Sequence, residues 1–321
     1  MEPGGFHLQV PNLFHDERID VRLETVRPKL IHLHRCRGIS RKFIQTLLHY
    51  DPSLNEIYSL PQAEISRKYS LPEKNTAFFF SDLHNLALRH KVLRDMERFK
   101  IITIVDESYP PMLNTIKDAP LVLYALGDTS LLSYSPSISV IGTRNPSPDA
   151  YKKTELIVKP LIKEKWLIVS GMARGIDSIA HKIALDCSGK TIAVLGGGFN
   201  HIYPKQNMNL FKQIINDGLV LTEYPPDIRP ARYHFPERNR IISGLSYGTL
   251  VIEAMERSGT LITVEQALDQ GREVFAVPGS PLQPQTKGCH RMIQDGAKLV
   301  LEAEDIFEEW TEIHKPIPNQ M

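Results

Sequence analysis

The chain has 321 residues, with 38 lysines and arginines against 37 acids, so its net charge is +1. This length accommodates one large domain and a small one. The near-zero net charge does not exclude nucleic-acid binding, because binding depends on where the charges lie. No apolar run approaches the ~20 residues of a membrane span, and residues 1–20 lack the cationic start and apolar stretch of a secretory signal. The cysteines, Cys36, Cys187 and Cys289, are far apart and form no CxxC pair, which favours reduced cytoplasmic thiols over disulfides or a zinc site.

The first hundred residues divide into a tail and a helical region. Residues 1–20 are polar and punctuated by Gly and Pro, which predicts a disordered tail. Over residues 21–100, apolar residues recur at three- and four-residue steps between prolines, which predicts a small all-helical domain. The turn Arg37-Gly38-Ile39-Ser40 also fits a SAM-like or helix-hairpin-helix module. Residues 21–50 carry seven Lys or Arg against one acid, Glu24, which is compatible with a solvated helix face or with DNA contact.

The remainder of the chain alternates between apolar strands and helices. Residues 101–135 are proline-rich and are expected to form a connector. Strands are predicted at 137–141, 167–169, 191–195, 219–221, 249–253 and 273–277, with helices at about 146–165, 176–186, 206–217 and 264–270. Residues 136–310 therefore predict an α/β domain with a doubly wound, mainly parallel sheet of the extended Rossmann type, followed by a tail at 311–321. Ligands of this fold class bind beyond the carboxyl ends of the strands.

Glycine-rich turns follow most of these strands. They are Gly142-Thr143-Arg144, Ser170 to Asp177, Gly196-Gly197-Gly198, Ser258-Gly259-Thr260 and Pro278-Gly279. Glycine loops at helix N-termini expose backbone N–H groups and can hold an anion, and Arg144 and Arg174 add planar charges suited to phosphate. The alternative is that each glycine only permits a tight turn. None of the loops matches GxGxxG or GxxxxGK[ST], so no dinucleotide or ATP cofactor is expected.

A second basic element lies between the fourth and fifth of these strands. From Asp227 to Arg240 the only acids are Asp227 and Glu237, and the arginines are interleaved with aromatic residues. The arginines are Arg229, Arg232, Arg238 and Arg240, and the aromatic residues are Tyr233, His234 and Phe235. Positive charge and aromatic rings together suit a single strand of nucleic acid. The alternative is that some of these arginines pack inward and pair with Glu223 or Glu253.

No set of catalytic residues emerges. Asp177 and His181 lie four residues apart on one predicted helix, where Asp177 favours the helix dipole and His181 can bond to it, so we interpret the pair as structural. No Ser-His-Asp set and no metal-ligand cluster shows the required spacing. The sequence predicts neither an enzyme nor a metal site.

The order of motifs along the chain resembles a known family. The motifs are Tyr109-Pro110, Val140 to Arg144, Ser170 to Asp177 with Ala180-His181, Tyr203-Pro204-Lys205, Phe235-Pro236, Arg238 to Ser246, Ser258 to Thr263, Val277-Pro278-Gly279 and Gly296-Ala297. From about residue 109 to 297, this order resembles the DprA/Smf family of DNA-processing proteins. His290 departs from the family pattern, in which asparagine is common at that place.

The resemblance implies a function and a set of site residues. It implies a cytoplasmic, homodimeric protein that binds and protects incoming single-stranded DNA and helps to load the RecA recombinase during natural transformation. Arg144 would be the main phosphate contact, and by family position the dimer surface would lie near Met292 and Ile293. The candidate DNA-binding residues are Gly142, Thr143, Arg144, Ser170, Gly171, Met172, Ala173, Arg174, Gly197, Phe199, Tyr203, Lys205, Phe235, Arg238, Asn239, Arg240, Ser258, Gly259 and Thr260.

Two other functions fit the fold class. Lysine-decarboxylase-like phosphoribohydrolases cleave nucleoside monophosphates and carry a Gly-Gly-x-Gly-Thr-x-x-Glu motif. Gly259-Thr260 echoes this motif, but Thr263 stands where the glutamate should be, and after Gly248-Thr249 the carboxylate of Glu253 comes one position late. Hydrolysis would then lack its general acid or base. The third interpretation is an interaction scaffold with a vestigial nucleotide pocket.

Overall fold

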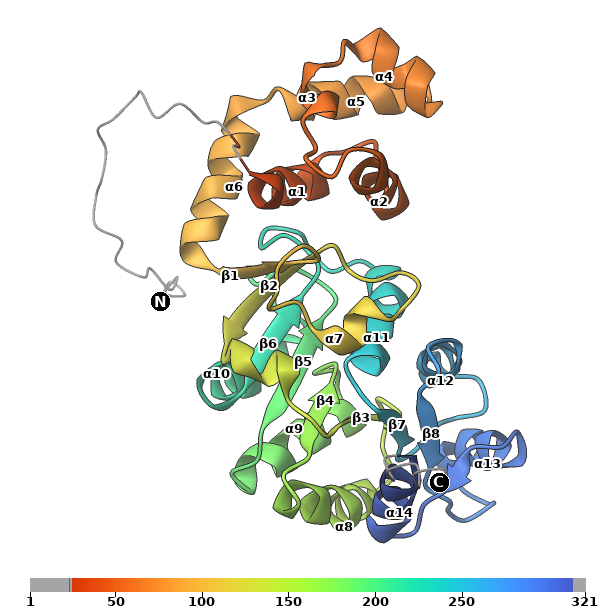
Figure 1. Cartoon of the computed structure of the whole chain (residues 1–321). Coiled ribbons are helices and arrows are strands. Elements are labelled where there is room, and N and C mark those ends of the chain that lie inside the picture. Colours follow the sequence, from red (N-terminus) through yellow and green to blue (C-terminus); the bar gives the residue numbers. More distant parts are fainter. Residues whose placement is uncertain (1–22, 24, 314–321) are drawn as a thin grey trace, which may run out of the picture.

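The computed structural model describes residue 23 and residues 25–313, so the predicted tail at 1–20 and most of the one at 311–321 lie outside it. The described N-terminal part is helical, as predicted (Figure 1). Its helices are α1 (Val26–Arg35), α2 (Arg41–Tyr50), α3 (Glu56–Ser59), α4 (Gln62–Tyr69), α5 (Glu73–Leu83) and α6 (Leu86–Arg98). The side chains of Ser40 and Asn85 accept hydrogen bonds from the first turns of α2 and α6, which fixes where these helices begin.

The second part is built on a single nine-stranded sheet in the order β1-β2-β6-β5-β4-β3-β7-β8-β9. The strands are β1 (Lys100–Thr103), β2 (Val122–Gly127), β3 (Ser137–Ile141), β4 (Leu167–Ser170), β5 (Thr191–Leu195), β6 (Leu219–Thr222), β7 (Gly248–Val251), β8 (Glu273–Ala276) and β9 (Lys298–Leu299). Across the sheet, every neighbouring pair in the run β6-β5-β4-β3-β7-β8-β9 is parallel, whereas the pairs β1–β2 and β2–β6 are antiparallel. The mainly parallel sheet of the prediction is confirmed.

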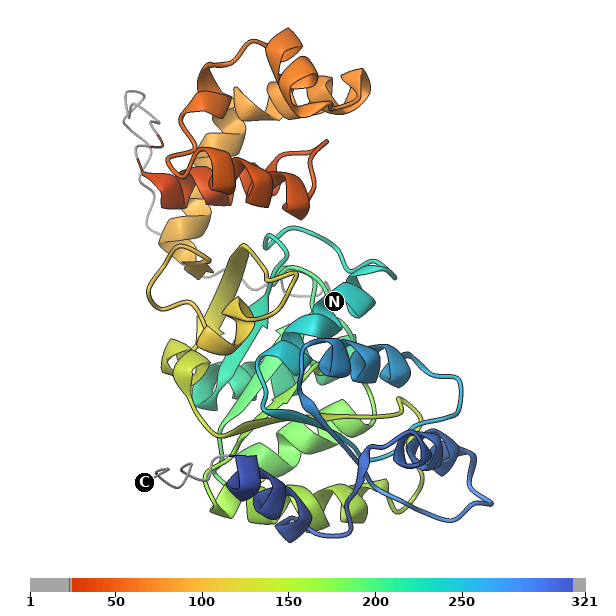
Figure 2. The same cartoon turned by 45° about the vertical axis from the view of Figure 1, so that its right-hand side comes forward.

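Helices cover both faces of this sheet (Figures 1 and 2). One face packs against α7 (Pro111–Asn114), α11 (His234–Gly244), α12 (Gly259–Asp269) and α13 (Lys287–Gln294). The other packs against α8 (Ala150–Lys163), α9 (Ile176–Asp186), α10 (Met208–Asp217) and α14 (Glu304–Ile313). Apolar strands such as β3 and β5 are buried along their whole length because both of their faces are covered. No helix in the described part of the chain is long and apolar enough to cross a membrane.

The expected connector at 101–135 contributes strands to the sheet. Most of β1 lies in this segment and all of β2 does, and they add an antiparallel edge next to β6. The prolines make this segment resemble a linker in the sequence. In the structure, Pro110 and Pro111 lie at the start of α7, and Pro120 lies shortly before β2. The helical region also packs on this edge, because Leu30, Leu33 and Val92 share one hydrophobic cluster with Val122 and Tyr124 of β2. The two parts of the chain are therefore joined by a common core.

Candidate nucleic-acid interface

A cavity of about 590 Å³ opens beyond the carboxyl ends of the central strands. Its walls come mainly from the loops after β3, β4 and β7, which are neighbouring strands in the sheet, and from α11 and the start of α12. The loops after β5 and β6 add Tyr203 and Arg232. The lining residues are Ile141, Gly142, Thr143, Arg144, Asn145, Ala173, Asp177, Tyr203, Arg232, Phe235, Pro236, Arg238, Asn239, Ile242, Ser258, Gly259, Thr260, Ile262 and Thr263. A smaller recess beside it shares Arg144, Tyr203 and Phe235 and adds Gly171 and Arg174. This is the edge at which ligands of doubly wound sheets bind.

Arg144 is the most prominent cation of the cavity. It is exposed, and its guanidinium carbon lies 5.6 Å from the ring centroid of Phe235. The Phe235 ring lies in turn 5.7 Å from the ring of Tyr203, which is also exposed. A guanidinium over an aromatic face is held by a cation–π interaction while its edge remains open to other partners. The arrangement places an exposed positive charge and two aromatic rings side by side.

The Arg144 loop is fixed to its neighbours by backbone contacts. Thr143 donates its N–H to the carbonyl of Glu253 at 2.7 Å, and its own carbonyl accepts from Ile176 at 3.3 Å. Gly175, which precedes α9, has φ +80°, and a Cβ there would lie 2.9 Å from the Cα of Arg144. Only glycine allows this close approach of the two loops. The loops after β3 and β4 thus hold each other in place.

A buried carboxylate, Asp177, and a buried guanidinium, Arg238, form part of the cavity wall. The Asp177 carboxylate accepts the N–H groups of Gly171 at 3.2 Å and Ala173 at 3.4 Å, and Arg238 donates to the carbonyl of Val194 at 2.5 Å. Burial lowers the pKa of Arg238 to about 10, although Asp177 opposes the shift, so Arg238 is charged at neutral pH. Burial likewise raises the pKa of Asp177 against the effect of Arg238. The two charges are opposite in sign, so together they fix the loop after β4 and add little net charge beside Arg144.

Thirteen of the nineteen predicted residues line the cavity or its recess. They are Gly142, Thr143, Arg144, Gly171, Ala173, Arg174, Tyr203, Phe235, Arg238, Asn239, Ser258, Gly259 and Thr260.

The other predicted residues lie elsewhere. Ser170 and Met172 are buried, with the hydroxyl of Ser170 donating to the carbonyl of Val140. Phe199 is buried with its ring 5.5 Å from that of Phe99, so it packs in the core instead of facing a ligand. Gly197 is buried, and Lys205 is exposed next to Pro204 of the recess.

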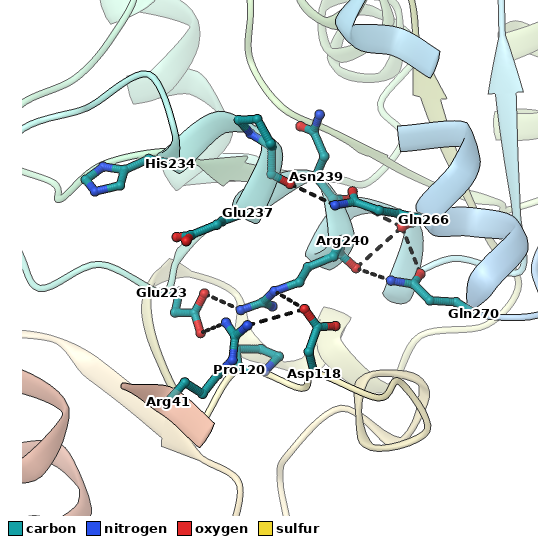
Figure 3. A network of polar contacts seen from close by, with 12 residues as sticks. Arg41, Asp118, Pro120, Glu223, His234, Glu237, Asn239, Arg240, Gln266 and Gln270 are labelled. Atoms are coloured by element: carbon teal, nitrogen blue, oxygen red, sulfur yellow. Dashed lines mark hydrogen bonds and ion pairs between the residues drawn. The ribbon is translucent and has the colours of Figure 1, made fainter. Parts of the chain in front are cut away.

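Arg240 belongs to a different network, shown in Figure 3. Its Nη2 donates to Glu223 at 2.5 Å, and its Nε lies 3.1 Å from a carboxylate oxygen of Asp118. Arg238 and Asn239 line the cavity, whereas Arg240 and Glu237 line a second cavity of about 1110 Å³ behind α11. For Arg240 the inward alternative is correct, because helical periodicity turns it away from the face that bears Arg238.

The basic run of the helical region is largely occupied by internal contacts. Within the described residues, Arg27 pairs with Asp106, Arg35 with Asp95 and Asp227, Arg37 with Asp82, and Arg41 with Asp118 and Glu223. Lys29 donates to the carbonyl of Ser53 and to Asn55. Most of these charges therefore stabilise the fold and its domain contact.

Several residues that line the cavity are not among those predicted from the sequence. Arg232 is exposed on the cavity wall, and its place in the Arg-rich run was the available signal. Asn145 and Asp177 lie in or next to loops that the motifs single out. Ile242, Ile262 and Thr263 also lie within the motifs, but their side chains do not distinguish them from core residues.

Other polar residues of the motifs are engaged in structural contacts. His181 lies with Nδ1 2.6 Å from the hydroxyl of Thr191, so it does not make the expected bond to Asp177. Glu253 is fully buried and accepts from the backbone and hydroxyl of Ser147 and from Lys153 at 2.7 Å, outside the cavity lining. His290 lies with Nε2 2.9 Å from the carbonyl oxygen of Gly279. None of these groups faces the space where a ligand would lie.

Comparisons with known proteins agree with this architecture. The family model described as DNA recombination-mediator protein A matches residues 100–311. The DNA processing protein DprA of Bacillus subtilis is 47% identical over 211 residues, which cover 66% of this chain and 71% of that protein.

Two solved structures are also similar. DprA of Streptococcus pneumoniae matches with a TM-score of 0.78 and 40% identity, over 87% of this chain and 96% of that one. DNA processing protein A of Helicobacter pylori, whose structure is described for its single-stranded DNA binding mode, matches with a TM-score of 0.60 and 29% identity, over 67% of this chain and 97% of that one. The chain belongs to the DNA recombination-mediator protein A family, the DprA/Smf proteins.

Proposed function

We propose that this chain binds single-stranded DNA at the cavity around Arg144. The observation that carries the proposal is the Arg144–Phe235–Tyr203 arrangement, in which a cation and two rings adjoin one cavity. A single strand offers phosphates for the cation and unpaired bases for the rings. The likeness to the Helicobacter pylori protein supports the same ligand.

Three further groups would extend the contact along a strand. Arg174 and Arg232 are exposed beside the cavity, and the N-terminus of α12 at Gly259 presents backbone N–H groups to it. Helix N-termini favour phosphate because of their unpaired N–H groups and the helix dipole. We infer that the backbone of the strand passes these groups while bases lie on Phe235 or Tyr203.

The preference for single strands provides the direct test. In a duplex the bases are stacked inside the helix, and a cavity of this size cannot take them unless the pair opens. We expect a labelled oligonucleotide to bind far more tightly than the duplex of the same sequence, measured by fluorescence anisotropy at one salt concentration. Equal affinity for the two would refute the proposed site.

The remaining parts of the proposal come from the family. By resemblance, the protein acts as a homodimer in the cytoplasm, protects incoming strands and helps to load RecA, and it does so without catalysing a reaction. Loading is tested by the rate at which RecA assembles on single strands with and without this protein. Incubation with AMP tests the alternative, since release of adenine would favour a phosphoribohydrolase.

A further inference from the structure

The segment from Glu223 to Arg240 runs from the end of β6 through the first two turns of α11, and it supplies Arg232, Phe235 and Arg238 to the cavity. It also packs on the loop after β5, where Gly198 donates to the carbonyl of Ile228 at 2.8 Å. The helical domain contacts this segment at two places that are distinct from the cavity. Both contacts are made by charged side chains.

The first contact holds Asp227 between two helices. Arg35 of α1 donates to one carboxylate oxygen of Asp227 at 2.9 Å, and Lys91 of α6 donates to the other at 2.6 Å. Arg35 is itself buried and pairs with Asp95, so its guanidinium has one well-defined position. Asp227 is therefore linked to both α1 and α6 of the helical domain.

The second contact lies at the start of the segment and is drawn in Figure 3. Arg41 of α2 donates to Glu223 at 3.1 Å and to Asp118 at 3.3 Å, and these are the carboxylates that also hold Arg240. The cavity of about 1110 Å³ separates α2 from α11 and α12 around this point. Apolar packing is interrupted there, so the ion pairs bridge the gap.

Charges held by several partners in a partly buried network have few alternative positions, and removing one partner leaves the others to rearrange. Arg240 lies on α11 next to the cavity residues Arg238 and Asn239, so its position affects theirs. We propose that Arg41 and Lys91 are positioning residues, through which the helical domain holds the segment 223–240 in the conformation that binds DNA. The inference rests on the proposed function, but the docking it describes can be measured without DNA.

The test compares two variants with two matched controls in the full chain. Arg41→Gln and Lys91→Gln each remove one contact to the segment. Lys42→Gln and Arg94→Gln remove the same charge from exposed positions of the same helices. The measurements are the affinity for a labelled single strand, the slope of affinity against salt, and hydrogen exchange over residues 223–240 in the free protein.

We expect Arg41→Gln and Lys91→Gln to weaken binding roughly two- to thirtyfold, the range that corresponds to the effect of residues acting through a network. The salt slope should stay at its wild-type value because no phosphate contact is lost. Exchange over 223–240 should become faster, and Arg41→Lys should restore part of the affinity. The two controls should behave as wild type.

Two results would overturn the inference. If the control variants weaken binding equally and lower the salt slope, the helical domain acts by contacting the strand. If exchange over 223–240 is unchanged in Arg41→Gln and Lys91→Gln, these residues do not hold the segment. If the wild-type protein binds no single strand, the proposed function fails, and the exchange data still decide whether the helical domain holds the segment.

Discussion

Gly175→Ala tests whether the loops after β3 and β4 must touch for the site to form. Gly175 has φ +80° and ψ −132°, a conformation that costs a residue with a side chain about 1–3 kcal/mol. The added Cβ would overlap the carbonyl oxygen of Thr143 and lie 2.9 Å from the Cα of Arg144. Overlap of this kind in a packed region adds roughly 1–3 kcal/mol. The substitution should therefore destabilise the fold by about 2–6 kcal/mol in total.

Gly271→Ala is the matched control. Gly271 also has a positive φ, +66°, but a Cβ there would have no atom within 4 Å. Only the backbone term applies, so the loss should be about 1–2 kcal/mol.

Urea denaturation gives the free energy of unfolding of both variants, and oligonucleotide titration gives their affinity. We expect Gly175→Ala to be clearly less stable than Gly271→Ala and to lose strand binding, because the overlap is relieved by displacing the Arg144 loop. Equal stability of the two variants, with normal binding by Gly175→Ala, would refute the coupling of the loops.

Three further substitutions probe the site and its scaffold. Gly259→Ala adds a Cβ with no atom within 4 Å, so the stability of the fold should be unchanged. Affinity for a single strand should fall if the phosphates approach the start of α12, and unchanged affinity would exclude a phosphate contact there. Phe235→Leu should weaken binding by roughly 1–3 kcal/mol per stacked base without lowering the salt slope, and normal affinity would exclude stacking on this ring. Burial lowers the pKa of His181 to about 3. Below pH 6.5 this histidine is therefore protonated in the unfolded state but stays neutral in the native state. The free energy of unfolding should therefore fall by about 2 kcal/mol from pH 7 to pH 5 through this residue alone. Urea denaturation of His181→Gln should show a pH dependence of stability that is smaller by that amount. A pH dependence identical to that of the wild type would contradict the lowered pKa of His181.

The central strands and their loops could be predicted because burial on both faces leaves a simple pattern. The predicted bounds of the strand at 137–141 and of the helix at 176–186 match β3 and α9. Parallel strands end at one edge of the sheet, so the turns that follow them meet, and most of the residues predicted there line the cavity.

The edge of the sheet and the second basic element could not be predicted in the same way. Strands β1 and β2 pair antiparallel through a segment whose prolines resemble a linker. Arg238 and Arg240 belong to the same basic run, and the sequence alone does not tell them apart. Only their positions on α11 place Arg238 at the cavity and Arg240 at Glu223. Phe199 was likewise an aromatic residue in a glycine loop, but its ring packs on Phe99 of the segment before β1, a contact between residues 100 positions apart.

The salt dependence of strand binding by Arg144→Gln tests the central proposal most directly. Each phosphate contact to a single strand contributes about 0.7 to the slope of log affinity against log salt. If Arg144 holds a phosphate, Arg144→Gln should bind more weakly and its slope should be smaller by about that amount, while Arg67→Gln, an exposed arginine of the helical domain, should match wild type. An Arg144→Gln protein with wild-type slope and affinity would contradict the account.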